Sequence, residues 1–185
     1  LKADVEYGKN DQGKDIKMLL EFVSANPTGP LNIVSARAAA LGDSIAKLLT
    51  ASGAQVTKEY YVNDAGVQAR LFGQSLMAAC DRLNGGTAQA PEGGYQGAYM
   101  DDLAKDYVKV SPAPDPGKWG MEQVVQWQKT ALQRYDVSFD NWYSEKQNLH
   151  DKGLVVETVE KLKSLNLTYE KDGAVWIKVS EFGAP

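Results

Sequence analysis

Two short apolar segments on either side of a helical pattern constrain the fold of this chain more than any other feature. Residues 18–23 form an apolar run with a single acidic interruption, and residues 56–62 are rich in β-branched and aromatic side chains. Between them, leucine and isoleucine recur over residues 41–49 as the apolar stripe of a helix that a following glycine can end. Strand, helix and strand within about 45 residues make a βαβ unit, which predicts a parallel sheet.

The rest of the chain predicts a mainly helical segment and then a return to strands. The expected elements are helices over residues 66–83, 99–107, 121–135 and 155–166, a strand over 139–143 and a hairpin over 167–179. We therefore predict an α/β fold in three parts. Residues 1–66 form the βαβ unit, residues 67–150 a mainly helical insertion, and residues 151–185 a helix and hairpin that lead back to the sheet.

The composition argues against several classes of protein. The 185 residues carry a formal net charge of −4, whereas a dedicated nucleic-acid-binding module needs clustered Lys and Arg for phosphate contacts. The single cysteine, Cys80, excludes an internal disulfide, and the single histidine, His150, leaves no histidine cluster for a metal. Cys80 lies in an Ala-rich helical pattern, so we predict a buried thiol there and no metal site.

The apolar runs and the two ends of the chain give expectations about where the protein is located and whether the sequence is complete. No apolar run approaches the roughly 18–20 residues that cross a bilayer, and the first residues lack the apolar core of a signal peptide. We therefore expect a cytoplasmic protein without a membrane contact. The chain begins without methionine and stops just after a predicted strand, so we expect a fragment or a truncated gene product. The sequence leaves the oligomeric state open.

The polar loop after the first predicted strand is the strongest candidate for a ligand site. In an open α/β sheet, ligands bind where the carboxyl end of a strand and the N-terminus of the next helix meet. Glu21 interrupts the apolar strand just before this loop, and a carboxylate there is costly without a cation. A cationic ligand would supply that partner. Asn63 and Asp64 follow the second strand, where they either line the same cleft or simply cap the next helix.

The loop sequence resembles a known family of enzymes. Ser-Ala-Asn-Pro-Thr-Gly-Pro-Leu at residues 24–31 is similar to the stretch before the first signature motif of bacterial arginyl-tRNA synthetases, class I enzymes with a Rossmann catalytic core. Further similar segments follow in the same order along nearly the whole chain. They are Ala-Leu-Gly-Asp at residues 40–43, Tyr-Tyr-Val-Asn-Asp-Ala-Gly at 60–66, Gly-Tyr-Gln-Gly at 94–97, Phe-Asp-Asn-Trp-Tyr-Ser-Glu at 139–145 and Tyr-Glu-Lys-Asp-Gly-Ala-Val-Trp at 169–176.

The resemblance implies the N-terminal half of a synthetase catalytic domain, with a Rossmann-like parallel sheet and a connective insertion. Members of the family use ATP, with Mg²⁺, to activate arginine as an adenylate, and they then transfer the arginyl group to tRNA(Arg). By position, Glu21, Ser24 and Asn26 would hold the arginine, and Asn63 and Asp64 would line the same cleft.

The first signature motif departs from the family pattern Pro-Leu-His-x-Gly-His-x-Arg. Asn32 and Ser35 stand at the two histidine positions, which carry the catalytic role in the family, and Val34 stands at the glycine position. Only Arg37 is retained among these ATP-binding positions. Uncharged side chains replace two groups that stabilise phosphate charge, and a β-branched side chain fills space that the nucleotide needs. We therefore predict impaired ATP binding.

Two functions remain open at this point. The first is a catalytic-domain fragment of a synthetase, which we expect to be inactive alone because the second signature, a lysine-rich loop, and the anticodon-binding domain do not occur in these residues. The second is a catalytically dead relative that binds arginine, a tRNA end or a protein partner. An unrelated nucleotide-binding domain is disfavoured, because no Gly-x-Gly-x-x-Gly pattern follows a predicted strand.

Overall fold

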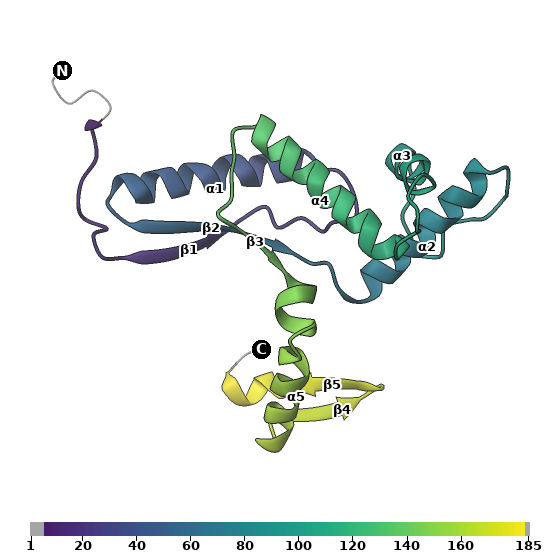
Figure 1. The fold of residues 1–185 in the computed structure, drawn as a ribbon. Coiled ribbons are helices and arrows are strands. Elements are labelled where there is room, and N and C mark those ends of the chain that lie inside the picture. Colours follow the sequence, from purple (N-terminus) through teal and green to yellow (C-terminus); the bar gives the residue numbers. More distant parts are fainter. Residues whose placement is uncertain (1–5, 184–185) are drawn as a thin grey trace. The chain divides into compact units, whose positions relative to one another are not determined.

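The computed structural model describes residues 6–183, which form two compact units. The first unit ends at Glu145 and the second begins at Lys146. The first contains the sheet and the large helices, and the second contains a short helix and a hairpin (Figure 1).

The first unit is built on a three-stranded parallel sheet, which confirms the predicted fold class. Its strands are β1 (Lys17–Glu21), β2 (Gln55–Val62) and β3 (Asn141–Ser144). β2 lies in the middle and pairs in parallel with both neighbours. All three strands therefore end at the same edge of the sheet.

Helix α1 (Ile33–Ala51) connects β1 to β2 and contacts the sheet through its small residues. The buried positions of this helix are Ala39, Gly42, Asp43 and Ala46. The larger apolar side chains that indicated the helix in the sequence are exposed: Leu41, Ile45 and Leu48. The position of Gly42 explains why this face of α1 contacts the sheet, because a Cβ atom at residue 42 would lie only 2.2 Å from the Phe22 ring. Small residues let the helix axis come close to the strands.

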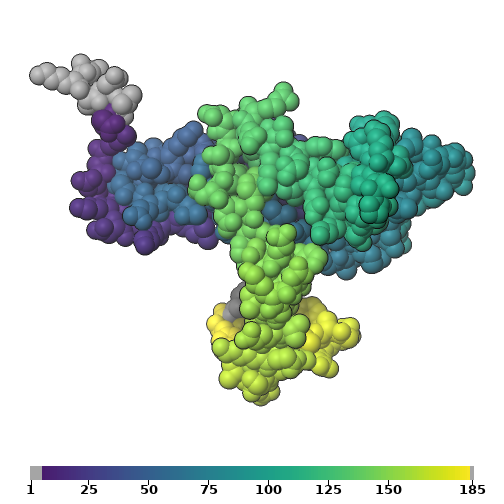
Figure 2. Space-filling model, in the orientation of Figure 1, coloured from purple at the N-terminus to yellow at the C-terminus, as the bar shows by residue number. Residues whose placement is uncertain are grey.

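Three helices follow β2 and form the insertion before β3. They are α2 (Gly66–Leu83), α3 (Ala98–Tyr107) and α4 (Pro116–Arg134). Their shared core contains Phe72, Leu76, Met100 and Val124, and side chains fill the space between the helices (Figure 2). Cys80 belongs to this core, which confirms a buried thiol, and burial raises its pKa.

Helix α4 also reaches the core on the sheet. Val124 packs in the insertion, whereas Leu132, two turns later, packs against Tyr60 and Val62 of β2. Tyr60 stacks on Trp142 of β3 with a centroid distance of 4.2 Å. One helix therefore contributes side chains to both cores of the first unit.

The second unit contains α5 (Leu154–Ser164) and an antiparallel hairpin of β4 (Thr168–Lys171) and β5 (Ala174–Ile177). A π-helical turn (Lys146–His150) precedes α5, and a 3₁₀ turn (Val179–Phe182) follows β5. The two residues of the hairpin turn, Asp172 and Gly173, have φ values of 53° and 74°, as a type I′ turn requires. This confirms the predicted hairpin.

A buried ion pair joins α1 to β2 and predicts a pH dependence of stability. The Asp43 carboxylate, 8% exposed, lies 2.7 Å from Lys47 Nζ and 3.2 Å from Lys58 Nζ. Burial alone would raise the pKa of Asp43, but hydrogen bonds and charge from Lys47 and Lys58 outweigh it and lower the pKa below 3.8. This stabilisation is therefore complete above pH 3.8 and is lost as the pH falls through the folded-state pKa.

We expect Asp43→Asn to lower the free energy of unfolding at pH 7 by roughly 2 kcal/mol, because charged hydrogen bonds are lost and two lysines are left without their carboxylate. Urea unfolding at several pH values measures this. The difference from the unmodified chain should shrink below pH 3.8. Asp102→Asn removes an exposed ion pair with Lys105 and serves as the control, with an expected change within about 0.5 kcal/mol. An equal loss in both variants would contradict the role of Asp43.

Candidate functional site

The predicted arginine-binding residues lie along the carboxyl edge of the parallel sheet. β1 ends at Glu21 and leads into the loop with Ser24 and Asn26, and β2 ends directly before Asn63 and Asp64. Because β1 and β2 are parallel, both connections leave the sheet at the same edge. The structure thus brings these residues to one edge of the sheet.

The loop after β1 begins with two strained residues that turn it toward β2. Val23 and Ser24 have φ values of 67° and 39°, in the left-handed region that a β-branched residue rarely adopts. Ser24 N donates to Phe22 O at 3.0 Å across this tight turn. The Ser24 hydroxyl then accepts a hydrogen bond from Tyr61 N at 3.1 Å. Ser24 therefore lies beside the end of β2, and Asn26 farther along the loop is exposed.

Glu21 lies next to a second carboxylate that the sequence reasoning missed. In the register of the sheet, Glu21 on β1 is opposite Glu59 on β2, and Glu59 is opposite Asn141 on β3. Residues paired in this way point to the same face of a sheet. The Asn141 side-chain amide donates to Glu59. Glu21 is exposed, so the expectation of a costly buried carboxylate at this position is wrong. The alternation of side chains along β2 could have indicated on which face of the sheet Glu59 lies. Only the register between β1 and β2 places Glu59 beside Glu21.

The ends of β2 and β3 are joined by polar contacts around Asp64. Ser144 Oγ donates to the Asp64 carboxylate at 2.6 Å. Tyr61 stacks on Tyr143 at 5.7 Å, and its hydroxyl donates to Glu145 at 2.9 Å. Burial, followed by the Glu145 carboxylate, raises the pKa of Tyr61 to about 12, so the phenol remains a proton donor at neutral pH. β3 therefore holds the Asp64 carboxylate through Ser144.

The residues at the two histidine positions bind each other at the start of α1. Asn32 is the N-cap, and its side-chain oxygen accepts from Val34 N at 3.0 Å and Ser35 N at 3.1 Å. The Ser35 hydroxyl also contacts this oxygen, at 3.3 Å. Val34, at the glycine position, is 69% exposed, and Arg37 is exposed one turn later. The Asn32 side chain therefore satisfies the N–H groups of the second and third residues of the helix.

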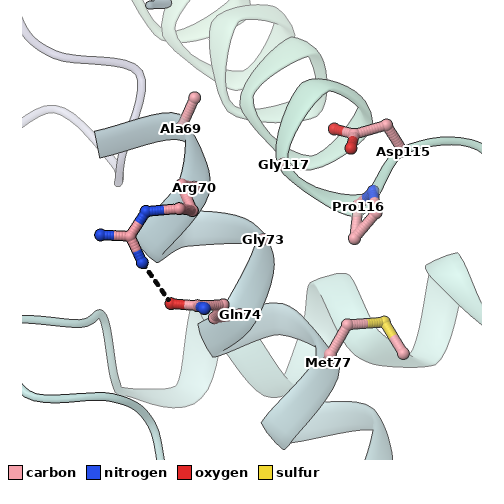
Figure 3. A pocket seen from close by; sticks show the side chains of 8 residues that line it. All are labelled: Ala69, Arg70, Gly73, Gln74, Met77, Asp115, Pro116 and Gly117. Carbon is pink, nitrogen blue, oxygen red and sulfur yellow. Dashed lines mark hydrogen bonds between the residues drawn. The ribbon is translucent and has the colours of Figure 1, made fainter. Parts of the chain in front are cut away.

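A groove lies elsewhere, in the helical insertion. It has a volume of about 580 Å³ between α2 and the start of α4, and Arg70, Gln74, Met77 and Asp115 contribute to its wall (Figure 3). None of the predicted site residues lines it. Within residues 6–183, no group of three or more His, Cys, Asp or Glu side chains could hold a metal ion. No helix in that range is long and apolar enough to cross a membrane.

A family model described as "tRNA synthetases class I (R), catalytic domain" matches residues 1–185. The chain belongs to this family. It is 40% identical to the arginine–tRNA ligase of Caldanaerobacter subterraneus subsp. tengcongensis over 194 residues and 42% identical to that of Micrococcus luteus over 193. Each alignment covers 99% of this chain and 34% of the relative. The chain thus spans about a third of the length of these curated relatives.

Solved structures agree with the family assignment. A chain from Campylobacter jejuni, assigned as an arginyl-tRNA synthetase, superposes with a TM-score of 0.79 at 30% identity, over 98% of this chain and 42% of that one. The arginyl-tRNA synthetase of Thermus thermophilus superposes with a TM-score of 0.61 at 21% identity, over 96% of this chain and 32% of that one, and supports the fold alone. The mixed α/β architecture is therefore that of a class I synthetase catalytic core.

Proposed function

We propose that this chain is the part of an arginyl-tRNA synthetase catalytic domain that recognises arginine, with Glu21 as the main contact for a cationic group of the substrate. The observation that carries the proposal is the pairing of Glu21, the last residue of β1, with Glu59 within β2. Paired strands lie about 4.8 Å apart, so two carboxylates there repel each other unless a cation binds between or above them. Arginine carries two cationic groups, the guanidinium and the α-ammonium.

The other residues of the site complement the polar groups of an amino acid. Ser24 is held beside β2 by the Tyr61 amide, and its hydroxyl proton can be donated to a substrate carboxylate. Asn26 is exposed on the same loop and carries both donors and an acceptor. Asn63 and Asp64 would line the opposite side of the cleft. The relatives are arginine–tRNA ligases, so tRNA(Arg) is the proposed partner of the complete catalytic domain.

The start of α1 does not fit the phosphates of ATP. A helix N-terminus binds phosphate through free N–H groups, but the Asn32 oxygen already accepts from Val34 N and Ser35 N. Asn32 and Ser35 carry no charge, and the Val34 side chain occupies the position of the family glycine. We therefore assign neither ATP nor Mg²⁺ to these residues and propose that the chain does not activate arginine by itself.

A binding module without catalysis is the second candidate function. The contact between Asn32 and Ser35 favours it, because the side chain at the first histidine position caps α1 and the hydroxyl at the second donates to that cap. Such a module would keep arginine, a tRNA end or a protein as its ligand. An arginine-dependent ATP–pyrophosphate exchange assay on the purified chain addresses catalysis directly. Turnover comparable to that of an intact synthetase would overturn the proposed inactivity.

Calorimetric titration with arginine tests the proposed site. We expect saturable binding at millimolar or lower arginine and no binding of citrulline, which has nearly the same shape without the guanidinium charge. Glu21→Gln should weaken arginine binding about tenfold, because a charge-assisted hydrogen bond becomes a neutral one. Glu122→Gln, on the exposed side of α4, is the matched control and should bind as the unmodified chain does. Absence of heat at millimolar arginine, or equal affinity of Glu21→Gln, would contradict the proposal.

A further inference from the structure

Gln128 on α4 is a buried polar side chain whose amide makes three hydrogen bonds. Its side chain is 1% exposed and lies between the two cores that α4 connects. Its amide nitrogen donates to Asn26 O and to Gly29 O, each at 3.1 Å. Its amide oxygen accepts from the Tyr60 hydroxyl at 2.9 Å. A single side chain from the insertion therefore binds two backbone carbonyls of the loop of residues 24–30 and a side chain of the central strand.

We propose that Gln128 is a positioning residue that sets the conformation of residues 24–30 for substrate binding, with Tyr60 as its partner. The inference rests on the proposed arginine-binding function, because Ser24 and Asn26 belong to this loop. According to this proposal, the insertion affects arginine binding through Gln128, which contacts the loop and does not itself contact the substrate.

The hydrogen-bonding inventory determines how the Gln128 amide is oriented. Asn26 O and Gly29 O are carbonyl oxygens and only accept, so the amide must present its nitrogen to them. Its oxygen then faces Tyr60, whose hydroxyl must act as the donor. Burial raises the pKa of Tyr60, so the hydroxyl keeps its proton over the whole physiological range. Both donors and the acceptor of the Gln128 amide are used in this one arrangement.

Tyr60 extends the same network to the beginning of the loop. Its hydroxyl oxygen accepts from Ala25 N at 3.1 Å and also lies 3.1 Å from Ala25 O. Ala25 directly follows the strained pair Val23 and Ser24. A left-handed backbone at non-glycine residues is unfavourable and persists only where the surroundings hold it. The Tyr60 and Gln128 contacts fix the loop immediately after that strain.

A second helix of the insertion, α3, also contacts the loop of residues 24–30. Tyr99 of α3 donates from its hydroxyl to Thr28 O at 2.9 Å, and its ring lies against Gly29. Residues 26, 28 and 29 therefore all offer backbone carbonyls to side chains of the insertion. Pro27 between them is fully buried. Residues 24–30 form neither a helix nor a strand, so these contacts with the insertion determine the shape of the loop.

Three variants separate positioning from general stabilisation. Gln128→Leu keeps the approximate volume and removes all three hydrogen bonds, and Tyr60→Phe removes only the hydroxyl. Val124→Ala, one turn earlier on α4, creates a cavity in the insertion core and should destabilise the fold without contacting the loop. Each is compared with the unmodified chain at a temperature at which circular dichroism shows all proteins folded.

Two measurements are made on each protein: amide hydrogen exchange and calorimetric arginine affinity. For Gln128→Leu we expect exchange at residues 24–31 to rise at least tenfold, amides of α2 to keep their rates, and arginine affinity to fall about tenfold. Tyr60→Phe should change in the same direction by a smaller factor. Val124→Ala should keep arginine affinity within twofold and leave loop exchange unchanged relative to the rest of the first unit.

The outcomes separate this inference from the proposed function. Unchanged loop exchange in both Gln128→Leu and Tyr60→Phe would overturn the positioning role whatever the arginine result. Faster loop exchange with arginine affinity equal to that of the unmodified chain would also overturn it, because the conformation would then not matter for binding. If the unmodified chain binds no arginine, the proposed function fails, and loop-specific exchange in Gln128→Leu alone decides whether Gln128 holds the loop.

Discussion

Replacing Gly42 by alanine is expected to lower the free energy of unfolding by about 3 kcal/mol, at the upper end of the usual cost of overpacking. The added Cβ atom would lie 2.2 Å from Phe22 Cγ and 2.8 Å from Phe22 Cβ, and neither contact can be relieved by rotating a flexible chain end. Phe22 is itself held by Phe139, with a centroid distance of 4.5 Å. Helix α1 would therefore have to move away from β1.

Urea unfolding followed by circular dichroism measures this loss. Ser44→Ala, an exposed substitution two residues later on the same helix, is the control and should change stability by less than about 0.5 kcal/mol. Helix propensity alone would make Gly42→Ala stabilising by up to about 1 kcal/mol. A gain in stability would thus contradict the close approach of α1 to the sheet. The same variant should also disturb arginine binding, because Phe22 adjoins Glu21 and the loop.

Phe72→Ala is expected to cost about 4 kcal/mol, because it removes the largest fully buried side chain of α2 and leaves a cavity in the insertion core. Phe72 packs closely on α4, since a Cβ atom at Gly120 would lie 2.6 Å from its ring. It also contacts Tyr95, with a centroid distance of 5.4 Å. The cavity would therefore weaken the attachment of α4 to α2.

We further expect the insertion and the sheet of Phe72→Ala to unfold together, because α4 contributes Val124 to one core and Leu132 to the other. With Trp176→Phe in the background, which removes the tryptophan of the second unit, fluorescence reports on Trp119 and Trp127 in the insertion and on Trp142 in the sheet, and it should show a single transition. Met77→Ala, at a residue of the same helix that is 48% exposed, should cost less than about 1 kcal/mol. Two separate transitions would show that the insertion unfolds independently of the sheet.

The sequence predicted the helices and strands of the first unit because their signals are local. The apolar runs that end near Glu21 and Asn63 coincide with β1 and β2. The predicted helix between the two strands indicated a crossover connection, and the two strands are indeed parallel. The start of α4 differs: the expected helix begins at 121, whereas the structure begins it at Pro116, with Asp115 accepting from Lys118 N at 2.7 Å. A proline at the first helical position starts a helix there instead of interrupting one.

The face of α1 that contacts the sheet could not be read from its hydrophobicity. The stripe with Leu41, Ile45 and Leu48 correctly indicated a helix, but these side chains are exposed and the small residues around Gly42 are buried. How closely a helix approaches a strand depends on the side chains of both elements. Phe22, twenty positions away in the sequence, is one of them.

By itself, the sequence determined the family and the parallel βαβ unit, and it predicted the candidate residues for a cationic substrate. The tertiary structure alone decided that Glu59 lies beside Glu21, that the Asn32 cap of α1 also accepts from the Ser35 hydroxyl, and that Gln128 holds a loop about 100 positions earlier in the chain. The physical reason is that strand register and helix crossing arise from packing between distant segments. Hydrogen bonds between residues that are far apart in the sequence form only when folding brings their segments together.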